Sequence, residues 1–383
     1  MPRIVPIGLL DDDQKKFLLQ IDENPNQSFW INGFPGSGKT VLLYYAVKKI
    51  NDSYPNHKIA FTTFTHTLLN LFESITNEIN VEGLKNCTIY QFIKNAITQD
   101  VSICDEIQDY SYHMIVELKK LSHRLILAGD ANQSIYSRDP HFNDIIPPCE
   151  ESKKYLRITD VNLSINHRLP RKIILALNFI MNSNKIWQGA DAKKEGNLLF
   201  YESDSIAKEV SFIFKDAKEK AERSGLNVVI LFSRKKDMKL FANEVLSNHG
   251  INKFFGENFN SFNDYLEQKN VKIHFVVNQV GNLKQAESEK KVVLMTMHGA
   301  KGLDFDAVYL PLFNFDYEIY PHNPDKIETL LMVAMTRTKS DLIFSYNKIP
   351  HELLARIINK GICQQMTENS VDSDSIMFPS IDF

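Results

Sequence analysis

Residues 33–40 read Gly-Phe-Pro-Gly-Ser-Gly-Lys-Thr, and this glycine-rich segment lies between two apolar stretches. Phe29 to Ile31 precede it, and Val41 to Val47 follow it. A strand, a tight glycine turn and a helix in this order direct backbone N–H groups at the start of the helix toward bound phosphate. The segment therefore predicts an α/β domain that binds a nucleoside triphosphate. A chance match at an ordinary strand-to-helix turn is the alternative interpretation.

The residue types of this loop suit the triphosphate. Glycines allow the backbone to turn its N–H groups inward around the α and β phosphates. Lys39 brings a positive charge to the β and γ phosphates, and Thr40 offers a hydroxyl to Mg²⁺. The expected nucleotide contacts are Gly33, Pro35, Gly36, Ser37, Gly38, Lys39 and Thr40.

Composition limits the remaining possibilities. The 383 residues suffice for two or three domains, and no apolar stretch approaches the roughly 18 residues of a membrane span. The N-terminus lacks the order of a secretory signal, so the cytoplasm is the expected location. The four cysteines are scattered, which favours reduced thiols over disulfides or a zinc site. Because the net charge is -3, any nucleic-acid site should be a local groove.

Apolar strand-like runs alternate with helical patterns along the chain, which predicts parallel sheets covered by helices. The expected strands of a first domain are Phe29–Ile31, Ile59–Phe64, Val101–Cys104 and Leu125–Ala128. Those of a second domain are Leu198–Tyr201, Val228–Phe232, Val271–Val277, Val292–Thr296, Ala307–Leu312 and Leu342–Tyr346. Pro147-Pro148 and the charged residues after it predict a boundary near residue 150. The expected domains are therefore 1–150 and 151–365, followed by a flexible acidic tail over 366–383.

Two adjacent carboxylates, Asp105 and Glu106, end the apolar strand Val101–Cys104. ATP hydrolysis needs one carboxylate to hold Mg²⁺ and another to orient and deprotonate the attacking water. We expect Asp105 to be the metal ligand, together with Thr40, and Glu106 to be the general base. The alternative is a solvated pair of capping charges at the start of a helix.

Asp105 to Asp109 and Leu127 to Tyr136 resemble motifs II and III of the UvrD/Rep-like superfamily 1 helicases. Other segments resemble further motifs in the family's order. These are Gln14 for the adenine-reading glutamine, Phe64–Leu68 for motif Ia, Thr88–Phe92 for Ib, Asn166–Arg168 for IV, Thr296–Phe305 for V and Val333–Thr338 for VI. The resemblance implies two tandem RecA-like domains with an ATP site in the cleft between them. It also implies Mg²⁺-dependent ATP hydrolysis coupled to single-stranded nucleic acid, DNA in preference to RNA.

The resemblance also implies roles for residues far from the phosphate loop. Arg168 and Arg337 are expected in the second domain, where arginines acting across the cleft stabilise charge on the γ-phosphoryl group. Gln133 would report the state of the γ-phosphate to the nucleic-acid track. Surface or salt-bridge roles are the alternative for both arginines. The remaining implied nucleotide contacts are Gln14, His167, Gly302 and Asp304.

A track for single-stranded nucleic acid combines aromatic faces with hydroxyl and amide groups. The residues that resemble this track are Phe64, Thr65, His66, Thr88, Tyr90, Tyr136 and His298. Phe64 and Tyr90 could equally be core aromatics at strand ends, and His298 could be an interior histidine.

The sequence departs from the family at several points. Only 12 residues, Ile93 to Cys104, stand where accessory subdomain 1B is expected, and the 129 residues from Leu169 to Met297 leave little room for subdomain 2B. Ser137-Arg138-Asp139-Pro140 replaces an aromatic residue and an arginine that usually follow Tyr136. His167 stands where a tyrosine usually stacks on adenine.

Two functional hypotheses follow. The first is a minimal ATP-driven motor on single strands, which unwinds duplex poorly alone and works beside a partner such as a nuclease in a phage-defence complex. The second is a nucleotide-dependent switch that gates a partner without moving along a strand. The altered residues Arg138 and Asp139 favour the second modestly, and stimulation of ATP hydrolysis by single-stranded DNA discriminates the two.

Overall fold

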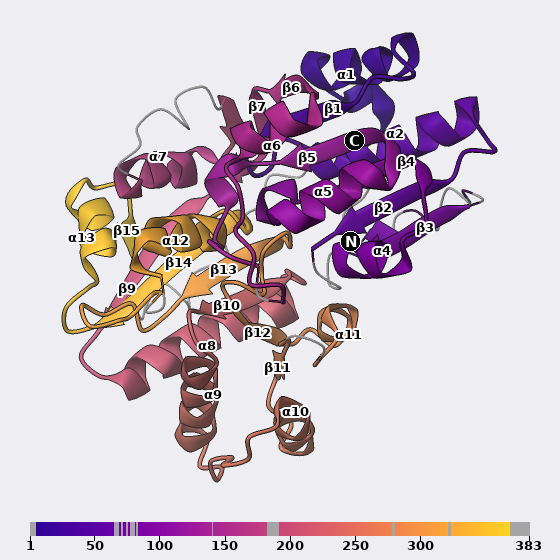
Figure 1. Cartoon of the computed structure of the whole chain (residues 1–383). Helices are drawn as coiled ribbons and strands as arrows, with labels where there is room; N and C mark the ends of the chain where they lie inside the picture. The colour runs from indigo at the N-terminus through magenta and orange to yellow at the C-terminus, as the bar shows by residue number, and fades with distance from the viewer. Residues whose placement is uncertain are drawn as a thin grey trace. The chain divides into compact units, whose positions relative to one another are not determined.

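The computed structural model describes residues 5–64, 69, 72–73, 76, 81, 83–139, 141–181, 191–277, 280–320 and 323–367. These residues form two compact units, coloured in chain order in Figure 1. The first unit comprises the described residues up to Arg168 together with 191–193. The second comprises those from Leu169 to Met181 and from Lys194 onward.

A sheet of six strands lies at the centre of the first unit, in the order β3-β2-β4-β5-β1-β6. The strands are β1 Phe29–Gly33, β2 Ile59–Thr63, β3 Leu84–Thr88, β4 Gln99–Cys104, β5 Ser122–Gly129 and β6 Thr159–Leu163. All neighbouring pairs are parallel, with Ile31 in register with Ala128 on one side and Val161 on the other. The carboxyl ends of the strands therefore lie along one edge of the sheet, where α/β proteins bind ligands.

Helices cover both faces of this sheet, because alternate residues of a strand point to opposite faces. Phe29 and Ile31 pack with α1 and α2, whereas Trp30 packs with α4, α5 and α6. The helices are α1 Asp12–Glu23, α2 Lys39–Ser53, α4 Ile89–Asn95, α5 Tyr112–Lys120 and α6 Cys149–Leu156, with short 3-10 turns η1 Ile7–Leu9, η2 Ile107–Asp109 and η3 Ala131–Gln133.

The second unit contains a parallel sheet of seven strands, in the order β11-β12-β10-β13-β14-β9-β15. The strands are β9 Asn197–Ser203, β10 Val228–Phe232, β11 Ile273–Phe275, β12 Val292–Thr296, β13 Phe305–Leu310, β14 Thr338–Asn347 and β15 Gln364–Gln365. A separate two-stranded sheet joins β7 Ile165–Pro170 to β8 Asp191–Lys194. The chain passes from the first unit to the second within β7.

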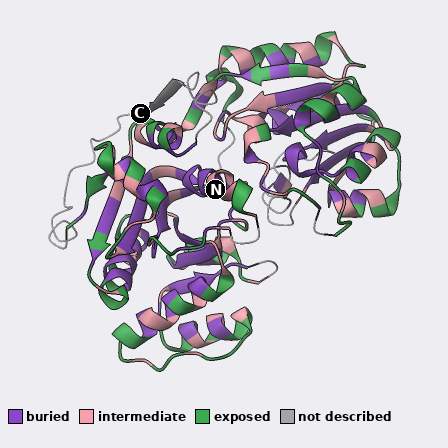
Figure 2. Cartoon of the chain, turned by 60° about the vertical axis from the view of Figure 1, so that its left-hand side comes forward, coloured by how far each residue is buried: buried purple, intermediate pink, exposed green. Residues whose placement is uncertain are grey.

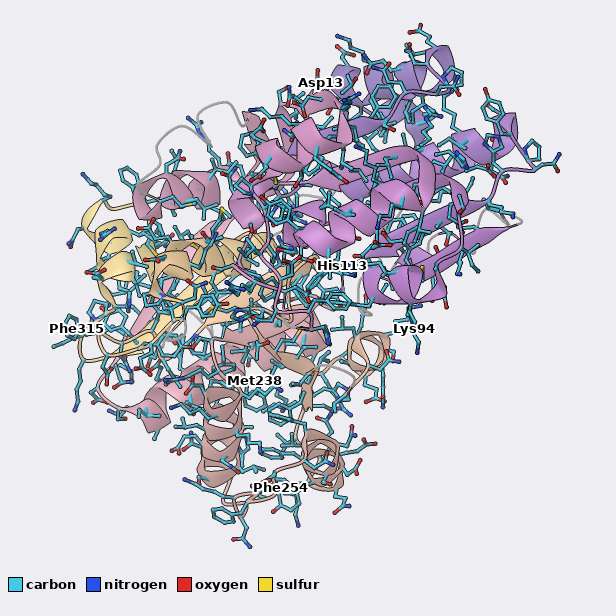
Figure 3. The ribbon with its side chains drawn as sticks, viewed as in Figure 1. Asp13, Lys94, His113, Met238, Phe254 and Phe315 are labelled. Atoms are coloured by element: carbon cyan, nitrogen blue, oxygen red, sulfur yellow. The ribbon has the colours of Figure 1, made fainter. Side chains whose placement is uncertain are left out.

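One face of the second sheet packs against α8, α9 and α10, where Ile230, Phe232 and Met238 are buried (Figure 3). The strand β9 contacts α7, and β14 contacts α12. The helices are α7 Arg171–Ile180, α8 Ile206–Arg223, α9 Lys235–Asn248, α10 Phe259–Gln268, α11 Leu283–Ser288, α12 Ile327–Met335 and α13 Glu352–Asn359, with the 3-10 turn η4 Pro324–Lys326. In both units the central strands are buried and the outer helix faces are exposed (Figure 2).

Two α/β units with parallel sheets flanked by helices match the fold class that the sequence predicts. The boundary differs from the expected one near residue 150, because α6 and β6 belong to the first unit. Pro148 is the N-cap of α6 and does not begin a linker. The described helices include none that combines the length and apolar character of a membrane span. Residues 368–383 of the expected acidic tail lie outside the described residues.

Candidate functional site

The phosphate loop connects β1 to α2 through a tight turn. The N–H of Ser37 donates to the carbonyl oxygen of Phe34 over 3.1 Å. Gly36 and Gly38 have φ angles of 86° and 87°, a left-handed conformation that favours glycine. Gly38 is also the N-cap of α2, so the backbone N–H groups at the start of this helix lack side-chain caps and are available to an anion.

Lys39 folds back over the loop. Its Nζ donates to the carbonyl oxygens of Gly33 at 2.7 Å and Phe34 at 3.3 Å. Burial lowers the pKa of Lys39, and the carboxylates of Asp130, Glu106 and Asp105 partly oppose that shift. The Lys39 side chain thus lies near three carboxylates, and this placement suits a group that binds phosphate oxygens.

Asp105 and Glu106 follow β4 and lie beside the start of α2. The hydroxyl of Thr40 donates to Asp105 Oδ2 over 2.7 Å, and the backbone N–H of Glu106 donates to Asp105 Oδ1 over 2.9 Å. Burial raises the pKa of Asp105 to about 6, and the neighbouring charge of Glu106 adds to the shift. The two residues that the sequence predicts as metal ligands are therefore in direct contact.

A glutamine without a predicted role joins the second carboxylate to β5. Gln108 Nε2 donates to Glu106 Oε2, and Gln108 Oε1 accepts from the backbone N–H of Asp130 over 3.0 Å. Asp130 Oδ2 in turn accepts from Gln133 Nε2 over 3.0 Å. Gln108 and Gln133 are both 2% exposed. A buried chain of hydrogen bonds thus runs from Glu106 to Gln133.

The residues of this site fit a triphosphate and Mg²⁺. Ser37 Oγ is buried and has no hydrogen-bond partner among the described residues, so it can accept or donate to a ligand at the loop. A Cβ at Gly33 would lie 2.3 Å from that oxygen, so the space beside it needs glycine. The oxygen atoms of Thr40 and Asp105 are the hard ligands that Mg²⁺ prefers.

Residues Asn166 to Arg168 pack against the phosphate loop within the first unit. Asn166 Nδ2 donates to the carbonyl oxygen of Pro35 over 2.8 Å, and the N–H of His167 donates to the carbonyl oxygen of Gly36 over 2.9 Å. A Cβ at Gly36 would lie 2.6 Å from Arg168 Cβ. The structure therefore groups Arg168 with the phosphate loop, which differs from its expected place in the second domain.

The start of α1 approaches the loop on the side of His167. Gln14 Nε2 donates to the carbonyl oxygen of Ser37 over 2.9 Å, and its Oε1 accepts from the N–H of Asp11 over 3.0 Å. Asp11 Oδ2 lies 2.6 Å from His167 Nε2. Asp11 thereby joins two nucleotide contacts that the sequence predicts, Gln14 and His167, although its own sequence position gave no signal beyond helix capping.

Arg337 belongs to the second unit, where it follows α12 and is 2% exposed. Its Nε donates to the carbonyl oxygen of Val333 over 2.9 Å. One terminal nitrogen donates to the carbonyl oxygen of Leu303 over 3.3 Å, and the second terminal nitrogen donates to Thr336 Oγ1 over 3.1 Å. The arginine thus ties α12 to the loop between β12 and β13.

That loop carries three other predicted residues: His298, Gly302 and Asp304. Gly302 has a φ of 80°, and it precedes Leu303, the residue that accepts from Arg337. The ring of His298 lies 4.7 Å from that of Tyr320 in an edge-on arrangement. Burial lowers the pKa of His298 to about 4, and the charge of Lys301 adds to the shift.

Three predicted nucleic-acid residues meet in the first unit. The ring of Phe64 lies 5.7 Å from those of both Tyr90 and Tyr136. Thr88 instead caps α4, where its hydroxyl accepts from the N–H of Gln91. Thr65 and His66 lie outside the described residues.

The altered residues after Tyr136 form a turn. Asp139 is 1% exposed and accepts from the hydroxyl of Tyr90 over 2.5 Å. Its carboxylate therefore lies beside the aromatic residues but is directed into the protein and away from solvent. Pro140 lies outside the described residues.

Two family models match the chain. Residues 20–139 match an AAA domain, and residues 255–349 match the UvrD-like helicase C-terminal domain. The second half of the chain thus contains a segment that matches a UvrD-like helicase C-terminal domain, and the first half contains a segment that matches an AAA domain. In the first unit α4 ends at Asn95 and β4 begins at Gln99, which leaves no inserted subdomain between them.

Solved structures of helicases are similar to the chain only at low identity. The nonstructural protein 10 helicase of an arterivirus is 14% identical with a TM-score of 0.46, over 86% of this chain and 61% of that protein. The C-terminal domain of a possible DNA helicase from Lactobacillus plantarum is 16% identical with a TM-score of 0.35, over 52% of this chain and 98% of that domain. The chain thus spans about three-fifths of the viral helicase. A search of curated proteins finds no match.

Proposed function

We propose that this protein is an ATPase that binds single-stranded nucleic acid, preferably DNA, and steps along it as it hydrolyses ATP. The contact between Thr40 and Asp105 beside Lys39 is the observation that carries the proposal. It joins the phosphate loop to the carboxylate pair, as ATP hydrolysis requires.

Thr40 and Asp105 would hold Mg²⁺, which neutralises charge on the β and γ phosphates when bound. Lys39 binds the same phosphates directly, in exchange for the carbonyl oxygens of Gly33 and Phe34. Glu106 takes the proton of the attacking water, and Gln108 fixes the direction of its carboxylate. Gly33 to Gly38 bind phosphate oxygens through N–H groups of the loop and the start of α2.

The two arginines contribute differently. Arg168 acts from the first unit, next to Gly36. Arg337 acts from the second unit, where its guanidinium donates to the carbonyl oxygen of Leu303. This hydrogen bond would couple the loop of Gly302 and Asp304 to a nucleotide that binds Arg337. Gln14 and His167 hold the base.

The nucleic acid would lie over Phe64, Tyr90 and Tyr136, at the carboxyl edge of the first sheet. Gln133 and Asp130 would transmit the state of Glu106 toward this track through Gln108. His298 would extend the track in the second unit, and the hydroxyl of Thr88 acts indirectly by fixing the start of α4.

The short connection between α4 and β4 supports work beside a partner. The direct connection of α4 to β4 leaves no subdomain there to split a duplex. We propose a partner that supplies this surface, such as a nuclease in a phage-defence complex. The switch hypothesis loses one of its supports, because Asp139 is buried against Tyr90 and does not present its charge to a strand.

Steady-state ATP hydrolysis, measured with and without single-stranded DNA, tests the proposal. The wild-type protein should be stimulated many-fold, and Lys39→Ala should abolish turnover while leaving the fold intact by circular dichroism. If single-stranded DNA does not change the rate of ATP hydrolysis by the wild-type protein, the motor hypothesis is refuted. Turnover above a few per cent in Lys39→Ala would refute the phosphate-loop assignment.

A further inference from the structure

The aromatic residues of the first unit continue beyond the three that the family resemblance identifies. The ring of Tyr90 lies 4.4 Å from that of His141 and 5.7 Å from that of Phe142. Phe142 in turn lies 5.0 Å from His113, at the start of α5 (Figure 3). A continuous aromatic strip therefore runs from Tyr136 through Phe64 and Tyr90 to these three rings.

This extension is exposed. The Phe142 side chain is 45% exposed, and His113 and His141 are also exposed. By contrast, Phe92 on the same α4 helix as Tyr90 is 2% exposed. His141 and Phe142 follow β5 along the chain and contact Tyr90, which follows β3. His113 follows β4 and contacts Phe142. The three rings therefore lie at the carboxyl edge of the parallel sheet.

The turn after Tyr136 holds Phe142 in this position. The carboxylate of Asp139 accepts from the N–H groups of His141 at 2.9 Å and Phe142 at 2.5 Å, in addition to the Tyr90 hydroxyl. Asn143, with a φ of 51°, then reverses the chain. The aromatic residue that the family resemblance implies shortly after Tyr136 is absent, and this turn brings Phe142, six residues after Tyr136, to the strip.

The charged groups around Phe142 are compatible with the binding of a polyanion such as single-stranded nucleic acid. Both oxygens of Asp144 are engaged by N–H groups, those of His113 and Ile145, each at 2.8 Å. Asp139 is buried. The side chain of Arg138 is exposed on the same turn and donates to the carbonyl oxygen of Asn143.

We propose that Phe142, between His141 and His113, is a stacking platform for an unpaired base of single-stranded nucleic acid, and that Asp139 is the positioning residue that holds it. This inference rests on the proposed function and adds a base-binding position to it. Aromatic faces stack on every base, so the platform binds without sequence preference.

Binding of a fluorescein-labelled oligothymidylate, measured by anisotropy, tests the platform. Phe142→Ala should weaken binding by about 5-fold or more, the lower range for loss of one base stack. Phe315→Ala is the matched control, since Phe315 is also a single exposed phenylalanine, 70% exposed, in the second unit (Figure 3). It should bind as the wild type does.

An abasic strand of the same length separates stacking from a structural effect. If Phe142 stacks on a base, wild type and Phe142→Ala should bind the abasic strand equally. Phe142→Trp should retain affinity for oligothymidylate, and its added tryptophan emission should be quenched by it. Equal binding of oligothymidylate by wild type and Phe142→Ala, or an equal loss on both strands, would overturn the platform.

A second variant tests the positioning role of Asp139. Tyr90→Phe keeps the ring but removes the hydroxyl that donates to Asp139, so it should weaken oligothymidylate binding less than Phe142→Ala does. In a Phe142→Ala background the same change should have no further effect. If the losses of affinity caused by Tyr90→Phe and Phe142→Ala add fully in the double variant, the link between the Tyr90 hydroxyl and the position of Phe142 is refuted. A wild-type protein that hydrolyses ATP but binds no single strand would instead refute the nucleic-acid part of the proposed function.

Discussion

Replacing Gly36 by alanine tests the contact between the phosphate loop and the segment Asn166–Arg168. The new Cβ would lie 2.6 Å from Arg168 Cβ and 2.9 Å from Asn166 Oδ1. Since carbon atoms pack at about 3.5 Å or more, the segment must move by roughly 1 Å. That movement breaks the hydrogen bond from Asn166 to Pro35 and strains the one from His167 to Gly36.

The magnitude follows from two contributions. The left-handed conformation costs an alanine about 1 to 2 kcal/mol relative to glycine. Loss of a buried hydrogen bond adds about 1 to 3 kcal/mol, which gives about 2 to 5 kcal/mol for Gly36→Ala. Gly83 has a φ of 81° in the same unit, and a Cβ added there would have no described atom within 4 Å. Gly83→Ala should therefore lower the free energy of unfolding only by the conformational contribution of about 1 to 2 kcal/mol.

Urea unfolding of the two variants and the wild type measures the difference, and a fluorescent ADP analogue measures nucleotide affinity. Gly36→Ala should be less stable than Gly83→Ala and should bind nucleotide more weakly. Arg168→Gly, which removes the nearest atom, should recover part of the stability when combined with Gly36→Ala. Equal destabilisation by the two alanines, with no recovery in the double variant, would refute the packing of this segment on the loop.

Three further predictions concern the chemistry. Glu106→Gln should slow ATP hydrolysis by roughly 100-fold while Mg²⁺-ATP binding persists. Rapid-quench kinetics measure the hydrolysis and equilibrium binding measures the affinity. An equal loss of hydrolysis and of Mg²⁺-ATP affinity would show that Glu106 has a structural role. Because the pKa of His298 is lowered to about 4 from 6.5, the unfolded chain binds its proton more readily, and stability should fall as the pH drops from 6.5 to 4. His298→Gln should lose less stability over that interval than the wild type, and parallel pH curves would contradict the shift. Finally, the isolated protein should hydrolyse ATP yet fail to displace a strand from a plain duplex of about 20 base pairs. Separating the strands costs roughly 1 to 2 kcal/mol per base-pair step. Efficient strand displacement by the monomer would contradict the minimal-motor hypothesis.

The sequence predicts the central strands well and misses most strands at sheet edges, β11 excepted. Central strands are buried on both faces and therefore appear as continuous apolar runs. The missed strands of the two large sheets are β3, β6 and β15, which all lie at edges, and the two-stranded sheet of β7 and β8 is missed as well. Thr159–Leu163 alternates polar with apolar residues. Without β6, the sequence predicts a first domain that ends near residue 150 and places Arg168 in the second, whereas the first unit extends to Arg168.

The contact between Thr40 and Asp105 was predictable because each belongs to a recognisable motif. Gln108 and Asp11 gave no such signal, since their contacts depend on which strands are neighbours and on how short turns are directed. The position of Phe142 depends on the left-handed turn at Asn143, which the sequence does not reveal. Spacing along the chain identifies the chemical groups, whereas the packing of turns decides which of them meet.

Gln14 has one further consequence. Both ends of its amide are already engaged, with Nε2 bonded to the Ser37 carbonyl and Oε1 to the N–H of Asp11. Each end keeps one further position, since Nε2 has a second N–H and Oε1 a second lone pair. A nucleobase that binds this amide would use these positions while the two existing bonds persist, so Gln14 would connect the base to the first turn of α1. Binding of a nucleotide should then slow hydrogen exchange at the Asp11 N–H, while a triphosphate without a base should leave that exchange unchanged.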